Sequence, residues 1–172
     1  MTGHDTHNIL QFAERAQFVL RQALPEDVMD ILRWRNDPYV CSMSKQNEPV
    51  SEVNHRIWYS QAVNDPNRLL LIGLLKGQKA GIVRFDLQQT ALWKVSITLA
   101  VEARGLGLGQ MFLKMALERL YIANAAVAVL AEVKSTNAPS LSIFQALGFI
   151  REGEDGELVR FVLPRASDLQ CL

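Results

Sequence analysis

The sequence predicts a mixed α/β fold in one domain, and three observations lead to this prediction. The chain has 172 residues, 49% of them hydrophobic and 21% charged, which suits one sizeable core. Short apolar runs alternate with segments that carry helix start signals. Closely spaced strands come first and a strand–helix–strand alternation comes later, so antiparallel pairs and a βαβ unit are expected to share the sheet.

The first part of the chain predicts one strand followed by two helices. Residues 17–22 form the strand, and Pro25 opens a helix that ends before Pro38, because the residue before a proline disfavours helical geometry. Residues 39–50 are predicted to be a loop. Ser51 then caps the second helix.

The rest of the chain predicts strands and helices that alternate after an initial hairpin. A tight Lys-Gly-Gln-Lys turn joins the first two of these strands. The strands are expected at residues 69–75, 80–87, 93–100, 127–133 and 158–163, and the helices directly after residues 105–109 and at residues 139–147. The predicted fold therefore has six strands and four helices.

The termini and the two cysteines favour a cytoplasmic protein. Residues 1–16 are a polar leader without the apolar core of a signal peptide, and residues 165–172 are a tail. No apolar run is long enough to span a membrane, so no membrane partner is expected. Cys41 and Cys171 match no metal-binding spacing, and a reducing compartment fits them best.

The charge balance argues against nucleic acid as a partner. The chain has 18 basic and 18 acidic side chains and a formal net charge of zero. Proteins that bind nucleic acid need a basic excess to displace counterions. An anionic partner would therefore be held locally, by a few arginines or by backbone N–H groups.

The strongest local motif is Arg-Gly-Leu-Gly-Leu-Gly at residues 104–109, between a predicted strand and a helix. Glycines let the backbone turn sharply, and the exposed N–H groups with the helix dipole form an anion site suited to a pyrophosphate. A plain tight connection also fits the motif. A dinucleotide-binding turn normally follows the first strand of a βαβ unit, whereas this one follows four predicted strands.

Two motifs together resemble those of the GNAT acetyltransferase family. Residues 104–109 match the family's Gln/Arg-x-x-Gly-x-Gly/Ala, which holds the pyrophosphate of coenzyme A. Residues 137–149 are similar to its second coenzyme segment, Asn-x-x-Ser/Ala-x-x-Leu-Tyr-x-x-x-Gly-Phe. The resemblance covers residues 17–164. It implies the GNAT fold, with a mostly antiparallel sheet of six or seven strands and about four helices, and acetyl-CoA as co-substrate.

The resemblance also implies how the coenzyme is held. The strand that ends at Leu99, Ala100 and Val101 is expected to splay from its neighbour and pair with the pantetheine arm, where a backbone N–H polarises the thioester carbonyl. Asn137 and Ser140 are expected near the pantetheine or the pyrophosphate, or else as a turn and a helix cap. The residues expected to bind the coenzyme are Leu99, Val101, Arg104, Gly105, Leu106, Gly107, Leu108, Gly109, Gln110, Asn137, Ser140 and Phe144.

Glu132 is the candidate general base. Acyl transfer to an amine benefits from a base, because most amines are charged at neutral pH. Strand alternation places Glu132 and Leu130 on the face opposite Val129 and Val133, and a carboxylate in an apolar strand is costly unless paired. Residues 132–137 also resemble the segment of ribosomal-protein N-terminal acetyltransferases whose glutamate is the base. The alternative is a pair with an arginine at the end of the sheet.

Phe144 departs from the family pattern. Many members have a tyrosine there that protonates the departing thiolate, and phenylalanine has no proton to give. The role is vacant or passes to water or another hydroxyl, for which Ser96, Thr98 and Tyr59 are candidates. Phe144 itself is expected to pack against the coenzyme.

The acceptor site is predicted at Arg35, Met43, His55 and Arg84. Arg35 ends the apolar stripe of the first helix, although it would also suit the helix C-terminus. A solvated sheet face would equally explain Arg84. For His55 the alternative is a structural role, because a lone histidine is more often structural than catalytic.

Segments around these residues resemble a GNAT subgroup that N-acetylates 4-amino sugars on nucleotide carriers, on the route to pseudaminic-acid-type sugars. In that subgroup an arginine, the following loop and a helix histidine line the nucleotide-sugar pocket, and the matching positions here are Arg35, Met43 and His55. The sequence thus predicts an enzyme that transfers acetyl to a nucleotide-linked 4-amino sugar by direct attack. Two alternatives stay open: an acetyltransferase of protein N-termini, and a coenzyme-binding module without turnover. A homodimer is also left open.

Overall fold

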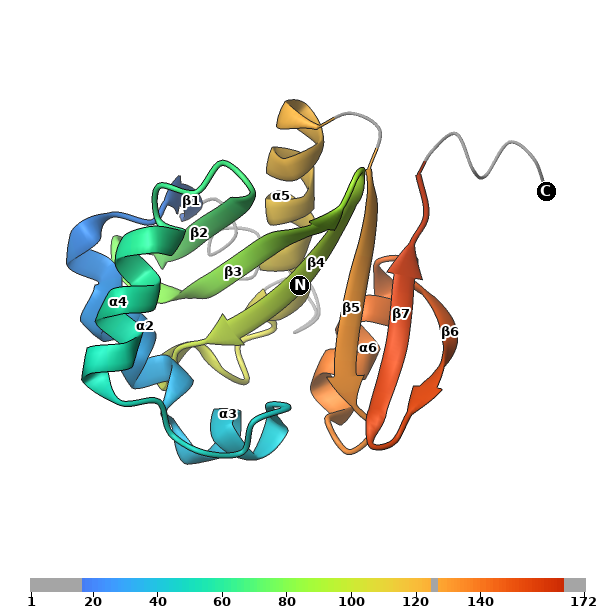
Figure 1. The fold of residues 1–172 in the computed structure, drawn as a ribbon, viewed down its shortest axis with the longest axis horizontal. Helices are drawn as coiled ribbons and strands as arrows, with labels where there is room; N and C mark the ends of the chain where they lie inside the picture. Colours follow the sequence, from blue (N-terminus) through green and yellow to red (C-terminus); the bar gives the residue numbers. More distant parts are fainter. Residues whose placement is uncertain (1–16, 125–126, 166–172) are drawn as a thin grey trace, which may run out of the picture.

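The computed structural model describes residues 17–124 and 127–165 and has a seven-stranded sheet with helices on both faces (Figure 1). The strands are β1 (Phe18–Gln22), β2 (Arg68–Leu75), β3 (Gln78–Gln89), β4 (Leu92–Leu99), β5 (Ala128–Lys134), β6 (Ile150–Asp155) and β7 (Leu158–Leu163). The helices are α2 (Val28–Arg35), α3 (Pro38–Met43), α4 (Glu52–Ala62), α5 (Leu108–Ala123) and α6 (Ala138–Ala146), with short 3₁₀ turns at Pro25–Asp27 and Val101–Ala103. The predicted mixed α/β class is confirmed.

The strand order is β1-β2-β3-β4-β5-β7-β6. Every neighbouring pair is antiparallel except β4 and β5, which run parallel and are joined through α5. The expected antiparallel sheet with one later βαβ unit is therefore present. The predicted leader and most of the predicted tail, residues 1–16 and 166–172, lie outside the described residues.

One face of the sheet is apolar and carries α5 and α6. Gly73 of β2 faces α5, because a Cβ there would lie 3.0 Å from the Phe112 ring. Side chains that share this face form a large part of the core, among them Leu71, Val83, Phe85, Val95, Val129 and Ala131. Phe144 of α6 stacks on Phe161, the cross-strand partner of Ala131. Both helices therefore pack on the same face.

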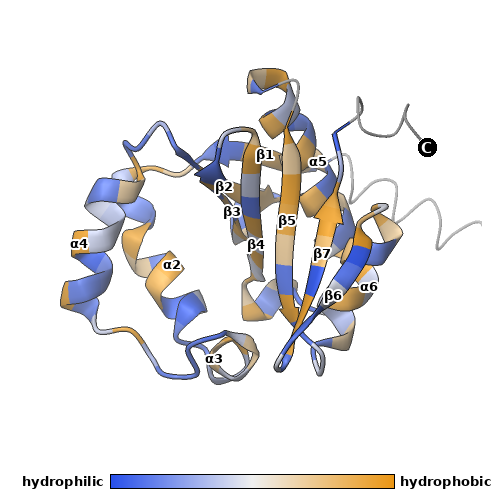
Figure 2. Ribbon diagram, turned by 45° about the vertical axis from the view of Figure 1, so that its right-hand side comes forward, coloured by the Kyte–Doolittle hydropathy of each residue, from blue (hydrophilic) through white to orange (hydrophobic). Residues whose placement is uncertain are grey.

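The opposite face, called the front face below, is polar over much of its area. Trp58 of α4 packs against the guanidinium of Arg84, so α4 lies on this face, and α2 packs beside α4 through the contact of His55 with Val28. Hydrophilic residues alternate with hydrophobic ones along β4 and gather at the lower end of β5 (Figure 2). By register, the front face of the central strands also holds buried Leu70, Ile72 and Ile82, and its other residues include Arg68, Arg84, Asp86, Lys94, Ser96, Thr98, Leu130, Glu132, Lys134 and Arg160.

Two elements differ from the sequence prediction. The prediction of a loop at residues 39–50 is wrong in its first part, because α3 covers Pro38–Met43. The Asp37 carboxylate accepts a hydrogen bond from the Val40 N–H at 3.2 Å and Pro38 fills the first helical position, so the dipeptide that ends α2 also starts α3. The strand β6 was missed because its six residues are all exposed and lack alternation, and its pairing with β7 holds it in the sheet.

A buried ion cluster joins the N-terminal elements to the sheet. The carboxylate of Asp27 is fully buried and accepts hydrogen bonds from Arg21 at 2.6 and 2.8 Å and from the Leu24 N–H at 2.8 Å, and Lys79 lies at 2.7 Å. Burial alone would raise the pKa of Asp27. The hydrogen bonds from Arg21, Lys79 and Leu24 outweigh burial and hold this pKa well below its usual range.

No helix in the described part of the chain is long and apolar enough to cross a membrane.

We expect Asp27→Asn to lower the free energy of unfolding by about 2 kcal/mol at pH 7, because two partly buried cations lose their partner. The folded-state pKa of Asp27 lies below the unfolded one, so its contribution is present above about pH 4 and is lost as the pH falls further. Urea unfolding at pH 7 and pH 3 measures this. Asp30→Asn, which removes a more exposed partner of Lys79, is the control and should cost less than about 1 kcal/mol. An equal effect of Asp27→Asn at both pH values would contradict the assignment.

Candidate active site

The central feature of the site is the divergence of β4 and β5. The two strands pair at only three positions: Leu92 with Ala128, Trp93 with Val129, and Lys94 with Leu130. Beyond these positions they separate, and in Figure 1 they meet at the top of the view and diverge downward. The expected splay of the strand that ends at Leu99 is therefore present. It leaves backbone N–H and C=O groups on the facing edges that a ligand can pair with.

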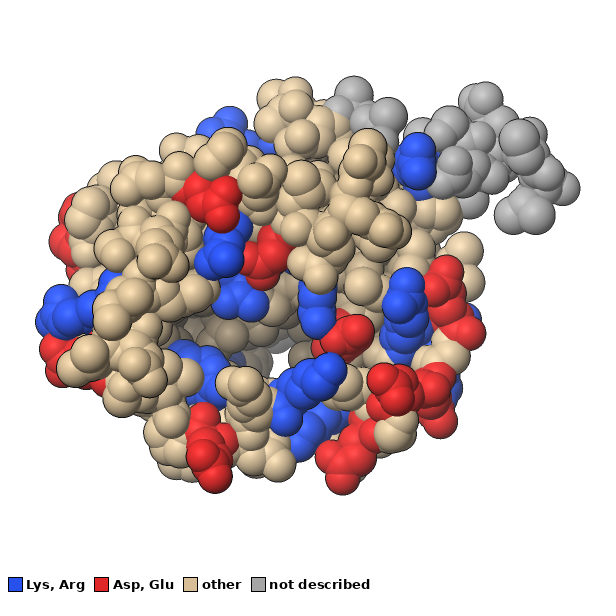
Figure 3. Space-filling view, in the orientation of Figure 1, with Lys and Arg blue, Asp and Glu red and all other residues tan. Residues whose placement is uncertain are grey.

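The divergence produces an opening in the molecular surface. Figure 3 shows a hollow in this region that passes through the molecule and is bordered by Lys and Arg side chains together with acidic and uncharged residues. In Figure 1, α3 lies below the gap between the two strands. A long, thin ligand could therefore reach from one face of the sheet to the other.

A glycine cradle leads into α5. Gly105 and Gly107 have left-handed backbones, with φ of 74° and 71°, and a Cβ at either would meet nothing within 4 Å. Gly107 directly precedes the sixteen-residue α5, whose first N–H groups point out of the helix end. Exposed Val101 and Leu106 lie beside the cradle. This geometry fits the pyrophosphate site predicted for residues 104–109.

Gly109 and Arg104 have roles that the sequence did not predict. A Cβ on Gly109 would lie 2.6 Å from Ile143 Cδ1, so this glycine lets α5 pack closely against α6. The guanidinium of Arg104 forms an ion pair with Asp37 at 2.9 Å, donates to the Leu99 carbonyl at 3.3 Å and lies over the Tyr39 ring. Arg104 therefore ties α3 to the end of β4.

The second predicted coenzyme segment forms the start of α6. Asn137, not Ser140, is the helix cap, because its side-chain oxygen accepts a hydrogen bond from the Ser140 N–H at 3.2 Å. Phe144 is 2% exposed and packs against Phe149 and Phe161, with ring centroids 5.0 and 6.2 Å away. Phe144 thus packs mainly in the core, and its contact with the coenzyme stays a prediction.

Glu132 lies at the edge of the opening, on the front face. Lys94 Nζ is 2.5 Å from Glu132 Oε2, so the partner is a lysine of β4 and not the arginine that the sequence suggested. The hydrogen bond from Lys94 lowers the pKa of Glu132. Burial opposes this effect, and the charges of Lys94, Lys45 and Arg160 add to it. Glu132 is therefore ionised at neutral pH and can accept a proton or a hydrogen bond.

The structure separates the three hydroxyls proposed in place of a tyrosine at position 144. The Tyr59 hydroxyl is buried and donates to the Leu24 carbonyl at 2.6 Å, and burial raises the pKa of Tyr59. This hydroxyl is thus committed to the packing of α4. Ser96 is exposed and Thr98 is half-buried, and both lie on the front face of β4 along the opening.

The predicted acceptor residues Arg35 and His55 make internal contacts. Arg35 donates to the carbonyls of Gln46 and Glu48, at 3.0 and 3.4 Å, and so fastens the loop after α3. His55 is 3% exposed, its Nε2 lies 2.9 Å from the Val28 carbonyl, and burial lowers its pKa.

The other two predicted acceptor residues lie nearer the opening. Arg84 Nε is 2.7 Å from Asp86 Oδ2 on the front face, and the guanidinium lies over Trp58. Met43, at the end of α3, lies 4.0 Å from the Thr136 hydroxyl in the connection that follows β5.

Comparison with known families now decides the class of the protein. The family model described as "Acetyltransferase (GNAT) domain" matches residues 17–150, which is well over half of the chain. The chain belongs to the GNAT acetyltransferase family. As a GNAT enzyme it is an N-acetyltransferase that uses acetyl-CoA as its acetyl donor. The sheet of this GNAT domain continues past the matched residues to Leu163 of β7.

Solved structures share the fold of this GNAT chain at low sequence identity. The spermidine N-acetyltransferase from Vibrio cholerae in complex with CoA and spermine has a TM-score of 0.77 at 17% identity, covering 90% of this chain and 99% of that one. A domain from Methanocaldococcus jannaschii has a TM-score of 0.74 at 22% identity, covering 85% and 97%. A dodecameric structure of the Vibrio enzyme has a TM-score of 0.74 at 18% identity, covering 91% and 98%. None of the curated proteins compared with the chain matches it significantly.

Two lysines near the GNAT site were not among the predicted site residues. Lys94 pairs with Glu132, and Lys134 is 8% exposed and donates to the Ser42 carbonyl at 3.0 Å and to Asn47 Oδ1 at 2.7 Å. Lys134 thus ties the loop after α3 to the end of β5. Strand alternation could have indicated both lysines. Lys94 shares a face of β4 with Ser96, and Lys134 shares a face of β5 with Glu132.

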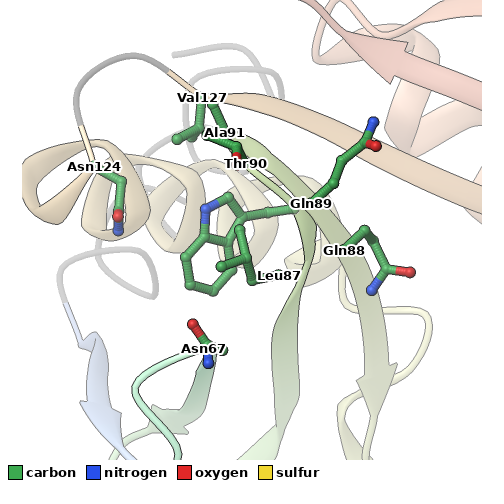
Figure 4. A pocket seen from close by; sticks show the side chains of 9 residues that line it. Asn67, Leu87, Gln88, Gln89, Thr90, Ala91, Asn124 and Val127 are labelled. Atoms are coloured by element: carbon green, nitrogen blue, oxygen red, sulfur yellow. The ribbon is translucent and has the colours of Figure 1, made fainter.

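A separate cavity of about 550 Å³ lies away from the opening, at the turn between β3 and β4 (Figure 4). Its lining has amide and hydroxyl groups but no charged side chain, and consists of Asn67, Leu87, Gln88, Gln89, Thr90, Ala91, Trp93, Asn124 and Val127. Within residues 17–124 and 127–165, no three His, Cys, Asp or Glu side chains lie close enough together to hold a metal ion.

We expect Gly107→Ala to weaken coenzyme A binding by about tenfold, because a methyl group would displace the pyrophosphate from a backbone N–H. Gly156→Ala is a matched control, since Gly156 has a φ of 58° and open space around it but lies in the turn between β6 and β7. Each variant should lose about 1 kcal/mol of stability through left-handed strain. Calorimetric titration with coenzyme A measures the affinities, and equal losses in both variants would contradict the cradle.

Proposed function

We propose that this enzyme acetylates the primary amine of a small acceptor that carries negative charge, and that the acceptor is a nucleotide-linked 4-amino sugar. The main support is the charge of the front face. Five cationic side chains lie there, each within 3.6 Å of a carboxylate: Arg68 with Asp65, Arg84 with Asp86, Lys94 with Glu132, Lys134 with Glu157 and Arg160 with Glu152.

The chemistry of these cations suits a pyrophosphate. Arginine presents a planar fork of donors that matches phosphate oxygens. Arg84 and Arg68 share one carboxylate, Asp86, at 2.7 and 3.6 Å, and Trp58 supports the guanidinium of Arg84. A nucleotide sugar has both the anionic group that such a pair would bind and an uncharged sugar ring that can extend toward Glu132.

The same charges argue against a polyamine acceptor. The Vibrio cholerae enzyme is described as a spermidine N-acetyltransferase and was solved with spermine, a polycation. A pair of guanidinium groups offers only hydrogen-bond donors, which suit the oxygens of a polyanion and not the ammonium groups of a polyamine. The shared fold therefore does not carry the acceptor of that enzyme over to this one.

The proposed reaction uses both sides of the opening. The glycine cradle holds the pyrophosphate of acetyl-CoA, and the pantetheine arm enters between β4 and β5. An unpaired N–H of β4 polarises the thioester carbonyl. The amine attacks the carbonyl carbon from the front face, Glu132 accepts the proton from the attacking nitrogen, and the C–S bond breaks. Ser96 or Thr98, or water, supplies a proton to the departing thiolate.

A thiol-release assay with acetyl-CoA tests the proposed acceptor. The panel contains a UDP-4-amino-4,6-dideoxy sugar, simple amino sugars, spermidine and short peptides with free N-termini. We expect kcat/KM to be highest for the nucleotide sugar and to fall with added salt, because charged groups attract the acceptor.

Arg84→Gln should raise KM for the nucleotide sugar by about tenfold, as for one lost charge-assisted hydrogen bond, without weakening coenzyme binding. Arg56→Gln removes an exposed ion pair with Glu52 on α4 and is the control. Preferential turnover of peptides or spermidine would contradict the proposed acceptor, and coenzyme binding without turnover on any amine would favour a binding module.

A further inference from the structure

Lys94 occupies a special position in the divergence of the strands. It is the last residue of β4 that pairs with β5, and its register partner is Leu130. Glu132 lies two residues further along β5, just beyond the last paired position. The contact of Lys94 Nζ with Glu132 Oε2, at 2.5 Å, therefore spans the apex of the opening, where the backbone ladder stops.

Other charges surround this pair, but most have partners of their own. The charges of Lys45 and Arg160 lower the pKa of Glu132. Arg160 donates a hydrogen bond to Glu152 at 3.1 Å. Lys134, on the same face of β5, is bonded to Ser42 and Asn47. Asp86 of β3, the register partner of Lys94, lies 2.7 Å from Arg84 and 3.6 Å from Arg68. Among the described residues, Lys94 is thus the side chain hydrogen-bonded to Glu132.

A carboxylate paired in this way is a weak base. The lowered pKa of Glu132 makes it unsuited to take a proton from an ordinary alkylammonium group, whose pKa is far higher. Once the neutral amine has attacked the thioester, its nitrogen carries positive charge next to an electron-withdrawing carbon and is much more acidic. A weak base is sufficient at that point. The amine must then reach the carbonyl already uncharged.

We propose that Lys94 is a positioning residue that holds Glu132 at the apex of the opening and, by offsetting the charge of Glu132, lets the acceptor amine bind in its uncharged form. This inference rests on the proposed function. The positive charge of Lys94 offsets the carboxylate charge of Glu132, which alone would stabilise the ammonium form of the amine that it contacts.

The acceptor releases its first proton to solvent on binding. The nitrogen then forms a bond to the acetyl carbon, Glu132 takes the second proton, the C–S bond breaks and the sulfur leaves with its electron pair.

The test is the pH dependence of kcat for the wild type, Lys94→Gln, Lys94→Arg and Glu132→Gln, with the acceptor that the panel identifies. In the wild type, we expect the acid limb of kcat to lie no higher than the solution pKa of the acceptor amine. Lys94→Gln keeps a hydrogen-bond donor for Glu132 but removes the charge. It should move the acid limb up by about one pH unit, so that kcat on that limb falls by about tenfold, with little change at high pH.

Lys94→Arg restores the charge and should restore the wild-type profile. Arg56→Met, which breaks the exposed pair with Glu52, is the control and should leave the profile unchanged. Coenzyme A affinity should be the same in all variants, since none touches the cradle. That affinity also reports whether each variant folds.

The outcomes for the two residues of the ion pair, Lys94 and Glu132, are distinguishable. If Glu132→Gln lowers kcat at every pH while Lys94→Gln leaves the acid limb in place, the role of Lys94 is overturned and Glu132 keeps its role. If Glu132→Gln has no effect on kcat, the base in the proposed function is itself wrong. A profile that shifts in Lys94→Gln and returns in Lys94→Arg supports the inference.

Discussion

The interrupted ladder between β4 and β5 is the constraint on which the rest of this structure depends. Two parallel strands that pair at three positions and then separate leave backbone groups without strand partners, which is costly unless something else satisfies them. Side chains hold the two halves of the sheet together around this gap. Lys94 ties its apex to Glu132, while Arg104 and Lys134 fasten α3 and its loop to the ends of the two strands. The result is an opening whose rim is held by ion pairs and hydrogen bonds and that a thin ligand can enter.

The two faces of the sheet differ in chemistry, and this difference lets two substrates meet. The face under α5 and α6 is apolar, and the glycine cradle lies at the start of α5. The front face carries paired cations and carboxylates along its central strands. An acetyl donor held at the cradle and an amine held on the front face would therefore meet only at the opening. The same scaffold can serve different acceptors, because the acceptor side depends on a few charged side chains and not on the fold.

The sequence predicted the periodic elements and the local motifs, and it failed where long-range contacts decide. The glycines at residues 105 and 107 and the alternation of β5 depend on local geometry, which is readable from the chain. The role of Arg104 depends on Asp37, and that of Glu132 on Lys94, which is 38 residues away. The start of α3 was missed because Asp37-Pro38 is both a stop and a start signal. The strand β6 was missed because an exposed edge strand owes its structure to its neighbour.

The most direct test of the central claim is amide hydrogen exchange measured by NMR with and without coenzyme A. If the pantetheine arm pairs with the free edge of β4, amides of residues 95–99 that point away from β3 gain protection, together with those of the cradle at residues 105–109. The already paired residues 92–94 and the neutral cavity at the turn between β3 and β4 should not change. Protection confined to that cavity, or none along residues 95–99, would show that the coenzyme does not bind between the diverging strands.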